Sequence, residues 1–156
     1  MDQFLHGRTA LVTGSTSGIG LAIACALGAA GARVAINGLG SEEQIAAAIA
    51  QVEAAGAQQA RHFGADLREP EQIAQMMAQI DAWSPLDVLV NNAGIQHAAP
   101  LAQQPLQKWN DIIAINLSSA FHTMRAAMPA MAARGYGRVV NVASVHGLVA
   151  SKDKAP

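Results

Sequence analysis

The residues with the clearest chemical potential lie in a glycine-rich turn near the N-terminus. Gly14, Gly18 and Gly20 separate an apolar run at 9–13 from a stretch of helical period at 18–30. The first glycine permits a sharp bend, the second lets the backbone approach a pyrophosphate, and the third allows a helix to pack closely on a strand. The helix N-terminus adds free N–H donors and the positive end of a dipole. The turn predicts a nucleotide site, although a glycine triplet alone also fits a plain tight turn.

Polar residues also follow the later apolar runs. Asp66 comes after the third run, Asn92 after the fourth, and Ser144 after the fifth. Asp66 has a simpler interpretation as a loop carboxylate that caps the next helix. The lone Cys25 has no partner at disulfide or metal spacing and is interpreted as a small core residue.

The elements that must position these residues alternate regularly. The sequence predicts strands at 9–13, 33–37, 60–64, 86–90 and 138–142, and helices at 18–30, at 42–55, from 70 onwards, and at 108–134. Ser41 and Gln44 have the spacing of a capping box, and Pro70 suits the first position of a helix. This alternation indicates an α/β domain whose parallel sheet is covered by helices.

Composition excludes several classes of protein. The 156 residues are 51% hydrophobic and 13% charged, with a net charge of -1, so neither general disorder nor a broad cationic surface for nucleic acid is expected. No apolar run is long enough to span a membrane, and the N-terminus lacks the basic flank of a signal peptide. We therefore expect a soluble, cytoplasmic protein. The stretch 143–156 holds no complete element, and we expect the chain to be part of a longer domain.

Three motifs, in this order, resemble the short-chain dehydrogenases/reductases. They are Thr13 to Gly20 after the first strand, Asn91 to Gly94 after the fourth, and Val142 to Ser144 after the fifth. The resemblance covers the whole chain. It implies one Rossmann-type domain over residues 1–156, incomplete at the C-terminus, with a doubly wound parallel sheet of strand order 3-2-1-4-5.

The resemblance also implies a dinucleotide cofactor and its contacts. Asp66 and Leu67 would lie against the adenine, and Asn92, Ala93 and Gly94 beside the adenosine ribose. The turn would contribute Gly14, Thr16, Ser17, Gly18, Ile19 and Gly20. The second strand ends without an acidic or a basic residue, and Ser17 stands where many NADP-dependent relatives carry a cation, so NAD is favoured over NADP.

The catalytic residues implied by the resemblance are only partly present. Ser144 matches the serine that hydrogen-bonds the substrate oxygen, and Asn116 matches the helix asparagine that organises a water leading to a lysine. The tyrosine that acts as acid or base would follow directly after Pro156, with its lysine shortly beyond. We therefore expect the 156 residues alone to be inactive and assign function to a longer parent.

Within this family the chain looks most like the dehydrogenases that act on D-3-hydroxybutyrate. By that resemblance Gln96, His146, Lys154 and Ser144 would bind the substrate, the first three through its carboxylate. The parent would oxidise (R)-3-hydroxybutyrate to acetoacetate with NAD and form a homotetramer. Alternatives are a 3-oxoacyl reductase, a sugar dehydrogenase, or a non-catalytic nucleotide-binding module. Each polar residue also has a plain interpretation as a solvated or backbone-satisfied side chain.

Overall fold

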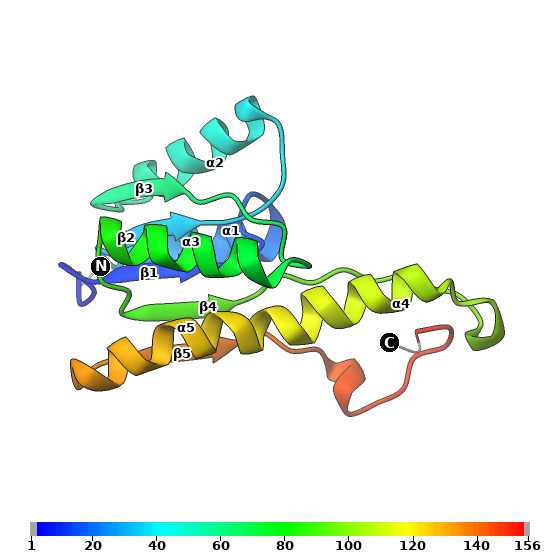
Figure 1. Ribbon diagram of the computed structural model, residues 1–156. Coiled ribbons are helices and arrows are strands. Elements are labelled where there is room, and N and C mark those ends of the chain that lie inside the picture. The colour runs from blue at the N-terminus through cyan, green and yellow to red at the C-terminus, as the bar shows by residue number, and fades with distance from the viewer. Residues whose placement is uncertain (1–2, 155–156) are drawn as a thin grey trace.

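The computed structural model describes residues 3–154 and shows a five-stranded parallel sheet of order β3-β2-β1-β4-β5 (Figure 1). Residues 1–2 and 155–156, at the two ends of the expected domain, lie outside the described residues. The strands are β1 (Thr9–Val12), β2 (Arg33–Ile36), β3 (Gln59–His62), β4 (Val88–Asn91) and β5 (Arg138–Asn141). The predicted fold class and strand order are confirmed, with each strand one or two residues from its predicted bounds.

Helices cover both faces of this sheet. They are α1 (Gly18–Ala29), α2 (Glu42–Ala54), α3 (Pro70–Trp83), α4 (Leu106–Ile113) and α5 (Ser119–Ala133). Residues of α1 and α2 pack with one face of the strands, whereas residues of α3 and α5 pack with the other. The chain therefore changes from one face to the other once, after β3, and the connecting loops lie at the two ends of the strands.

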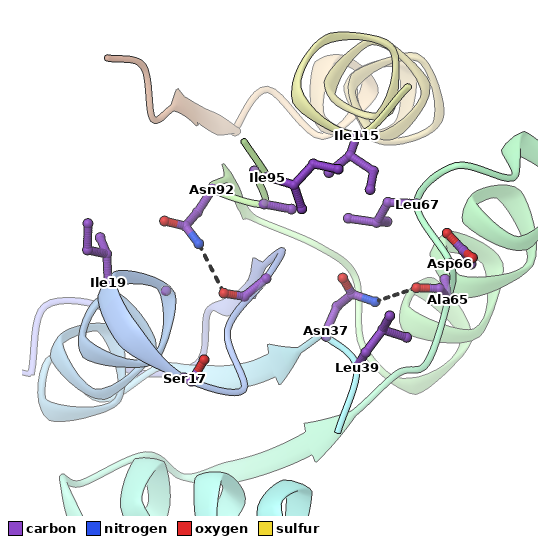
Figure 2. A pocket seen from close by; sticks show the side chains of 15 residues that line it. Ser17, Ile19, Asn37, Leu39, Ala65, Asp66, Leu67, Asn92, Ile95 and Ile115 are labelled. Carbon is purple, nitrogen blue, oxygen red and sulfur yellow. Dashed lines mark hydrogen bonds between the residues drawn. The ribbon is translucent and has the colours of Figure 1, made fainter. Parts of the chain in front are cut away.

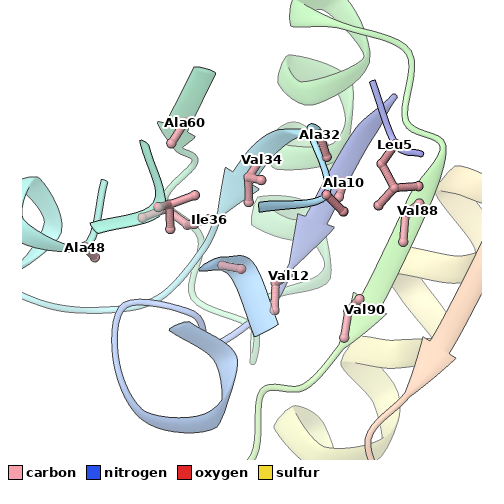
Figure 3. Packing of buried hydrophobic residues seen from close by; sticks show 13 residues of the cluster. Leu5, Ala10, Val12, Ala32, Val34, Ile36, Ala48, Ala60, Val88 and Val90 are labelled. Atoms are coloured by element: carbon pink, nitrogen blue, oxygen red, sulfur yellow. The ribbon is translucent and has the colours of Figure 1, made fainter. Parts of the chain in front are cut away.

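The core follows from the apolar strands. All of β1 is buried, and its side chains alternate between two clusters: Val12 faces α1 and α2, while Leu11 faces α3 and α5. Figure 3 shows the first cluster, in which Val34, Ile36 and Val90 lie beside Val12. A strand buried on both faces must be apolar throughout, as the sequence indicated.

Local signals in the sequence are also confirmed. Ser41 Oγ accepts a hydrogen bond from the Gln44 N–H, and the Gln44 side chain accepts one from the Ser41 N–H, which completes the capping box of α2. Pro70 is the first residue of α3. Shortly after α1, and not among these signals, Gly31 has a positive φ of 91°, a conformation that favours glycine.

The predicted helix at 108–134 differs from the structure. It begins earlier, at Leu106, and a π-helical segment, Ala114–Ser118, separates α4 from α5. A hydrophobic period cannot distinguish a single wide turn from regular α-helix, so the sequence did not indicate this segment. After β5, where no element was expected, the chain forms a short 3₁₀ helix at Val145–Gly147.

Within residues 3–154, none of the helices has the length and apolar character needed to cross a membrane.

Candidate functional site

A pocket of about 420 Å³ lies at the carboxyl ends of β1, β2 and β4 (Figure 2). It is lined by Gly14, Ser17, Ile19, Gly20, Asn37, Gly38, Leu39, Ala65, Asp66, Leu67, Asn92, Ala93, Gly94, Ile95 and Ile115. Its lining brings together nine of the eleven residues expected at a cofactor. Thr16 and Gly18 are the two that do not line it.

The glycine-rich turn is shaped by close contacts. Gly14 has φ of 63°, and a Cβ there would come within 2.8 Å of the Ala93 Cα. A Cβ on Gly20 would overlap the Gly14 carbonyl oxygen and the Asn92 amide. Gly20 was expected to pack on the strand, and it packs instead on the turn itself. Gly18 has φ of 58° and faces open space, so its backbone is accessible.

The turn is fixed to the end of β4 by side chains. The Asn92 Nδ2 donates to the carbonyl oxygens of Thr13 and Gly14, at 3.0 and 3.1 Å. The Thr13 hydroxyl accepts from the N–H groups of Asn92 and Ala93, at 3.0 and 3.1 Å. The Asn92 side chain therefore positions the turn, and its amide nitrogen is not free for a ligand.

The N-terminus of α1 faces the pocket. Ser17 is the N-cap residue, and its side chain makes no capping hydrogen bond. The first N–H groups of a helix have no partner within it, so they remain available to an anion such as a pyrophosphate. Thr16 lies beside the pocket and donates to the Leu39 carbonyl oxygen at 3.1 Å. Thr16 thus connects the turn to the loop after β2.

Asp66 is held by its neighbour Arg68. Its carboxylate accepts from the Arg68 N–H at 3.0 Å and from the Arg68 Nε at 3.0 and 3.1 Å. These bonds, together with the guanidinium charge, hold the pKa of Asp66 below its usual value. The capping interpretation of Asp66 is wrong, because Glu69 is the N-cap residue of α3 and the Asp66 carboxylate accepts instead from Arg68.

Asn116 lies in the π-helical segment and faces the loop after β4. Its Oδ1 accepts from the Ile95 N–H at 2.9 Å, and its Nδ2 donates to the Ile95 carbonyl oxygen at 2.8 Å. The amide therefore holds this loop from both sides. A Cβ added to Gly94 would lie 3.7 Å from the Asn116 Oδ1.

The expected substrate residues lie on two segments that meet. Gln96 is exposed on the loop after β4, and His146 and Lys154 are exposed after β5. The backbone N–H of Ala99 donates to the Asp153 carbonyl oxygen at 2.8 Å, which joins these two segments. Both extend from the carboxyl end of the sheet (Figure 1).

Ser144 begins the segment after β5. Its Oγ accepts a hydrogen bond from the His146 N–H at 3.2 Å. With that lone pair engaged, the hydroxyl proton remains available to donate to a substrate oxygen.

Six lining residues were not among the expected site residues: Asn37, Gly38, Leu39, Ala65, Ile95 and Ile115. Asn37 carried a signal, because a polar residue directly after a buried strand is unusual unless its side chain is hydrogen-bonded. The apolar members had no such signal. Among residues 3–154, no group of three or more His, Cys, Asp or Glu side chains could hold a metal ion.

Comparison with known proteins agrees with this arrangement. Residues 8–156 match the family model of the short chain dehydrogenases. The chain is 52% identical over 152 residues to a D-beta-hydroxybutyrate dehydrogenase of Cupriavidus necator and 47% identical over 149 residues to one of Rhizobium meliloti. These matches cover 97% and 95% of this chain but 58% of each relative, so the chain spans little more than half their length.

A solved structure is also similar. It is a 3-oxoacyl (acyl-carrier-protein) reductase from Agrobacterium tumefaciens C58 with NADP bound. The two share 37% sequence identity with a TM-score of 0.89, over 96% of this chain and 57% of the other.

Proposed function

The chain belongs to the short chain dehydrogenase family, and we propose that it forms the NAD-binding part of an enzyme that oxidises (R)-3-hydroxybutyrate to acetoacetate. The observation that carries the proposal is the meeting of the two loops that hold Gln96 and Lys154, beside a pocket built for a dinucleotide. The identity of 52% to a D-beta-hydroxybutyrate dehydrogenase supports the same substrate.

The pocket residues fit a dinucleotide. Gly14 and Gly20 leave no room for a side chain, whereas Gly18 faces open space beside the uncapped N-terminus of α1. These features suit a pyrophosphate held by backbone N–H groups, with Asp66 and Leu67 beside the base. A bound nicotinamide would accept the hydride of the reaction.

NAD is proposed rather than NADP because residues 37–40, which follow β2 at the rim of the pocket, include no Lys or Arg. Gly38 and Leu39 occupy this position, and the Leu39 side chain is 76% exposed. A 2′-phosphate placed there would meet an apolar side chain instead of an Arg or Lys.

Two residues of this chain, Ser144 and Asn116, would position the substrate for the reaction. The Ser144 hydroxyl would donate to the substrate oxygen, and Asn116 would hold the neighbouring loop through Ile95. The alcohol loses a hydride from C3 and a proton from its oxygen. The tyrosine and lysine that would receive this proton are expected outside the 156 residues.

Three residues would select a short hydroxy acid. Lys154 would supply the positive charge for the carboxylate, and Gln96 and His146 would supply neutral hydrogen-bond donors. All three side chains are exposed, and the Nδ1 of His146 lies 3.4 Å from the Val149 carbonyl oxygen.

The test is NADH formation at 340 nm by the full-length product of this reading frame with D-3-hydroxybutyrate and NAD. We expect Gln96→Ala and His146→Ala to raise KM at least about tenfold, because each removes a hydrogen bond to a charged carboxylate. Gln51→Ala, a change of an exposed amide on α2, is the matched control and should leave KM unaltered. A folded, NAD-binding enzyme that does not oxidise hydroxybutyrate would refute the substrate proposal.

The similar 3-oxoacyl reductase with NADP favours a second candidate, reduction of a 3-oxoacyl thioester. A full-length enzyme with this activity would reduce a 3-oxoacyl thioester with NADPH and would not oxidise free hydroxybutyrate. Running both assays on one preparation separates the candidates.

A further inference from the structure

The loop that follows β2, residues 37–39, lines one side of the pocket (Figure 2). Each of its three carbonyl oxygens accepts a hydrogen bond from outside the loop. The donors to Asn37, Gly38 and Leu39 are the Ser15 N–H at 2.6 Å, a ring nitrogen of His62 at 2.9 Å and the Thr16 hydroxyl at 3.1 Å. The course of this loop is therefore set by residues of two other segments.

His62 differs from the other two donors in its origin. Ser15 and Thr16 belong to the glycine-rich turn, whereas His62 is the last residue of β3 and lies beside Ile36, the last residue of β2, in the sheet. His62 is half-buried and is not among the residues that line the pocket. Its effect on a ligand in the pocket must therefore pass through Gly38.

The contacts of the His62 ring define its hydrogen bond. A carbonyl oxygen can only accept, so the His62 Nε2 carries a proton and donates it to the Gly38 oxygen. A Cβ added at Gly64 would lie 3.4 Å from the His62 Cε1, which places the backbone against the ring. A Cβ added at Gly38 would lie 2.6 Å from the Thr16 Oγ1, so the loop is packed against the turn on its other side.

We infer that His62 is a positioning residue for the dinucleotide, through its hydrogen bond to the Gly38 carbonyl oxygen. This inference rests on the proposed function, which places a dinucleotide in the pocket. A wall that is already held in place costs a ligand less binding free energy for ordering it. Ser144 and Asn116 lie on other segments, so His62 affects the affinity for the nucleotide and not the reacting atoms.

The test uses the full-length product of this reading frame. Isothermal titration calorimetry measures the affinity for ADP-ribose, and NADH formation from D-3-hydroxybutyrate measures kcat and the KM for NAD. We expect His62→Leu to weaken ADP-ribose binding about fivefold and to raise the KM for NAD by a similar factor, because one hydrogen bond is lost. The kcat should change by less than about twofold. His62→Met provides a second variant without a donor should the first not fold.

His62→Gln keeps a side-chain N–H donor and should restore both values to within about twofold of the wild type. His6→Leu is the matched control, because His6 is exposed before β1, at the opposite end of the sheet from the pocket, and it should alter neither value.

Three results would overturn the inference while leaving the dinucleotide site intact. They are an unchanged affinity for ADP-ribose in His62→Leu, an equal loss in His62→Leu and His62→Gln, and a lower kcat with an unchanged KM for NAD. An enzyme that binds ADP-ribose but does not oxidise hydroxybutyrate would refute the substrate proposal, and calorimetry alone would then decide the role of His62. Failure of the wild type to bind ADP-ribose would overturn the proposed dinucleotide site and this inference together.

Discussion

Arg68 controls the ionisation of a residue at the edge of the pocket. It donates to both carboxylate oxygens of Asp66 and also lies 3.8 Å from an Asp111 oxygen. Because the pKa of Asp66 is lowered, the pair stabilises the fold above the unfolded-state pKa of about 3.9. This contribution is lost as the pH falls through the lower pKa of the folded state.

Removing the guanidinium should therefore raise the pKa of Asp66. We expect Arg68→Ala to return it towards about 3.9, measured from the pH dependence of the Asp66 carboxyl ¹³C shift. Arg61→Ala is the control, because Arg61 lies over the Trp83 ring and not against Asp66. An unchanged Asp66 titration in Arg68→Ala would show that the ion pair does not set this pKa.

Of the three glycines in the turn, Gly20 leaves the least room for a side chain. A Cβ there would overlap the Gly14 carbonyl oxygen, so Gly20→Ala must displace the turn from the N-terminus of α1. We expect the free energy of unfolding to fall by about 1–3 kcal/mol, measured by urea titration, and ADP-ribose binding to weaken. Gly147→Ala, where a Cβ meets nothing within 4 Å, should change stability by less than about 0.5 kcal/mol. Equal stabilities of the two variants would contradict the steric argument.

At the scale of elements, the π-helical segment at Ala114–Ser118 sets the position of Asn116. Segments of this kind insert one extra residue per turn and are frequent at functional sites. Here the segment presents an amide that hydrogen-bonds both backbone groups of Ile95. The long helix thereby fixes the loop that leads to Gln96.

Asn116→Ala should loosen that loop. Loss of a hydrogen bond of about 1 kcal/mol predicts amide hydrogen exchange at Ile95 about fivefold faster or more. Gln107→Ala is a suitable control, because it removes a side-chain hydrogen bond to Asp111 within α4 and does not contact Ile95. Unchanged exchange at Ile95 would show that the loop is held by other contacts.

The elements were predictable from sequence because their signals are local. The apolar run of β1, the capping box at Ser41 and the proline at the start of α3 each report on a few adjacent residues. The pairing of Asn37 with Phe63 and Ala65 depends on where loops from different strands meet. Side-chain partners of this kind follow from the assembled sheet and could not be read from spacing.

At the scale of the whole molecule, β5 forms one edge of the sheet, and within residues 3–154 it pairs only with β4. Val139, Val140 and Val142 are 36%, 49% and 42% exposed there. An exposed apolar edge strand favours pairing with another chain. We expect the 156-residue chain to self-associate through this edge.

Val140→Lys should reduce self-association, because a charged residue on an edge strand opposes strand pairing. Light scattering at increasing protein concentration measures the effect. Gln51→Lys adds the same charge on α2, away from β5, and should leave self-association unaltered. Equal self-association of both variants and the wild type would place the contact elsewhere on the molecule.

The backbone hydrogen bond between Ala99 and Asp153 has an entropic consequence. β4 and β5 are already paired at Asn91 and Asn141. The bond therefore closes only a short loop, made by the segment from β4 to Ala99 and the segment from β5 to Asp153. The conformational freedom of the segment that ends at Lys154 is therefore restricted during folding, before any small molecule arrives. A ligand that binds between the two segments meets a pre-organised partner, and less of its binding free energy is lost to ordering the chain.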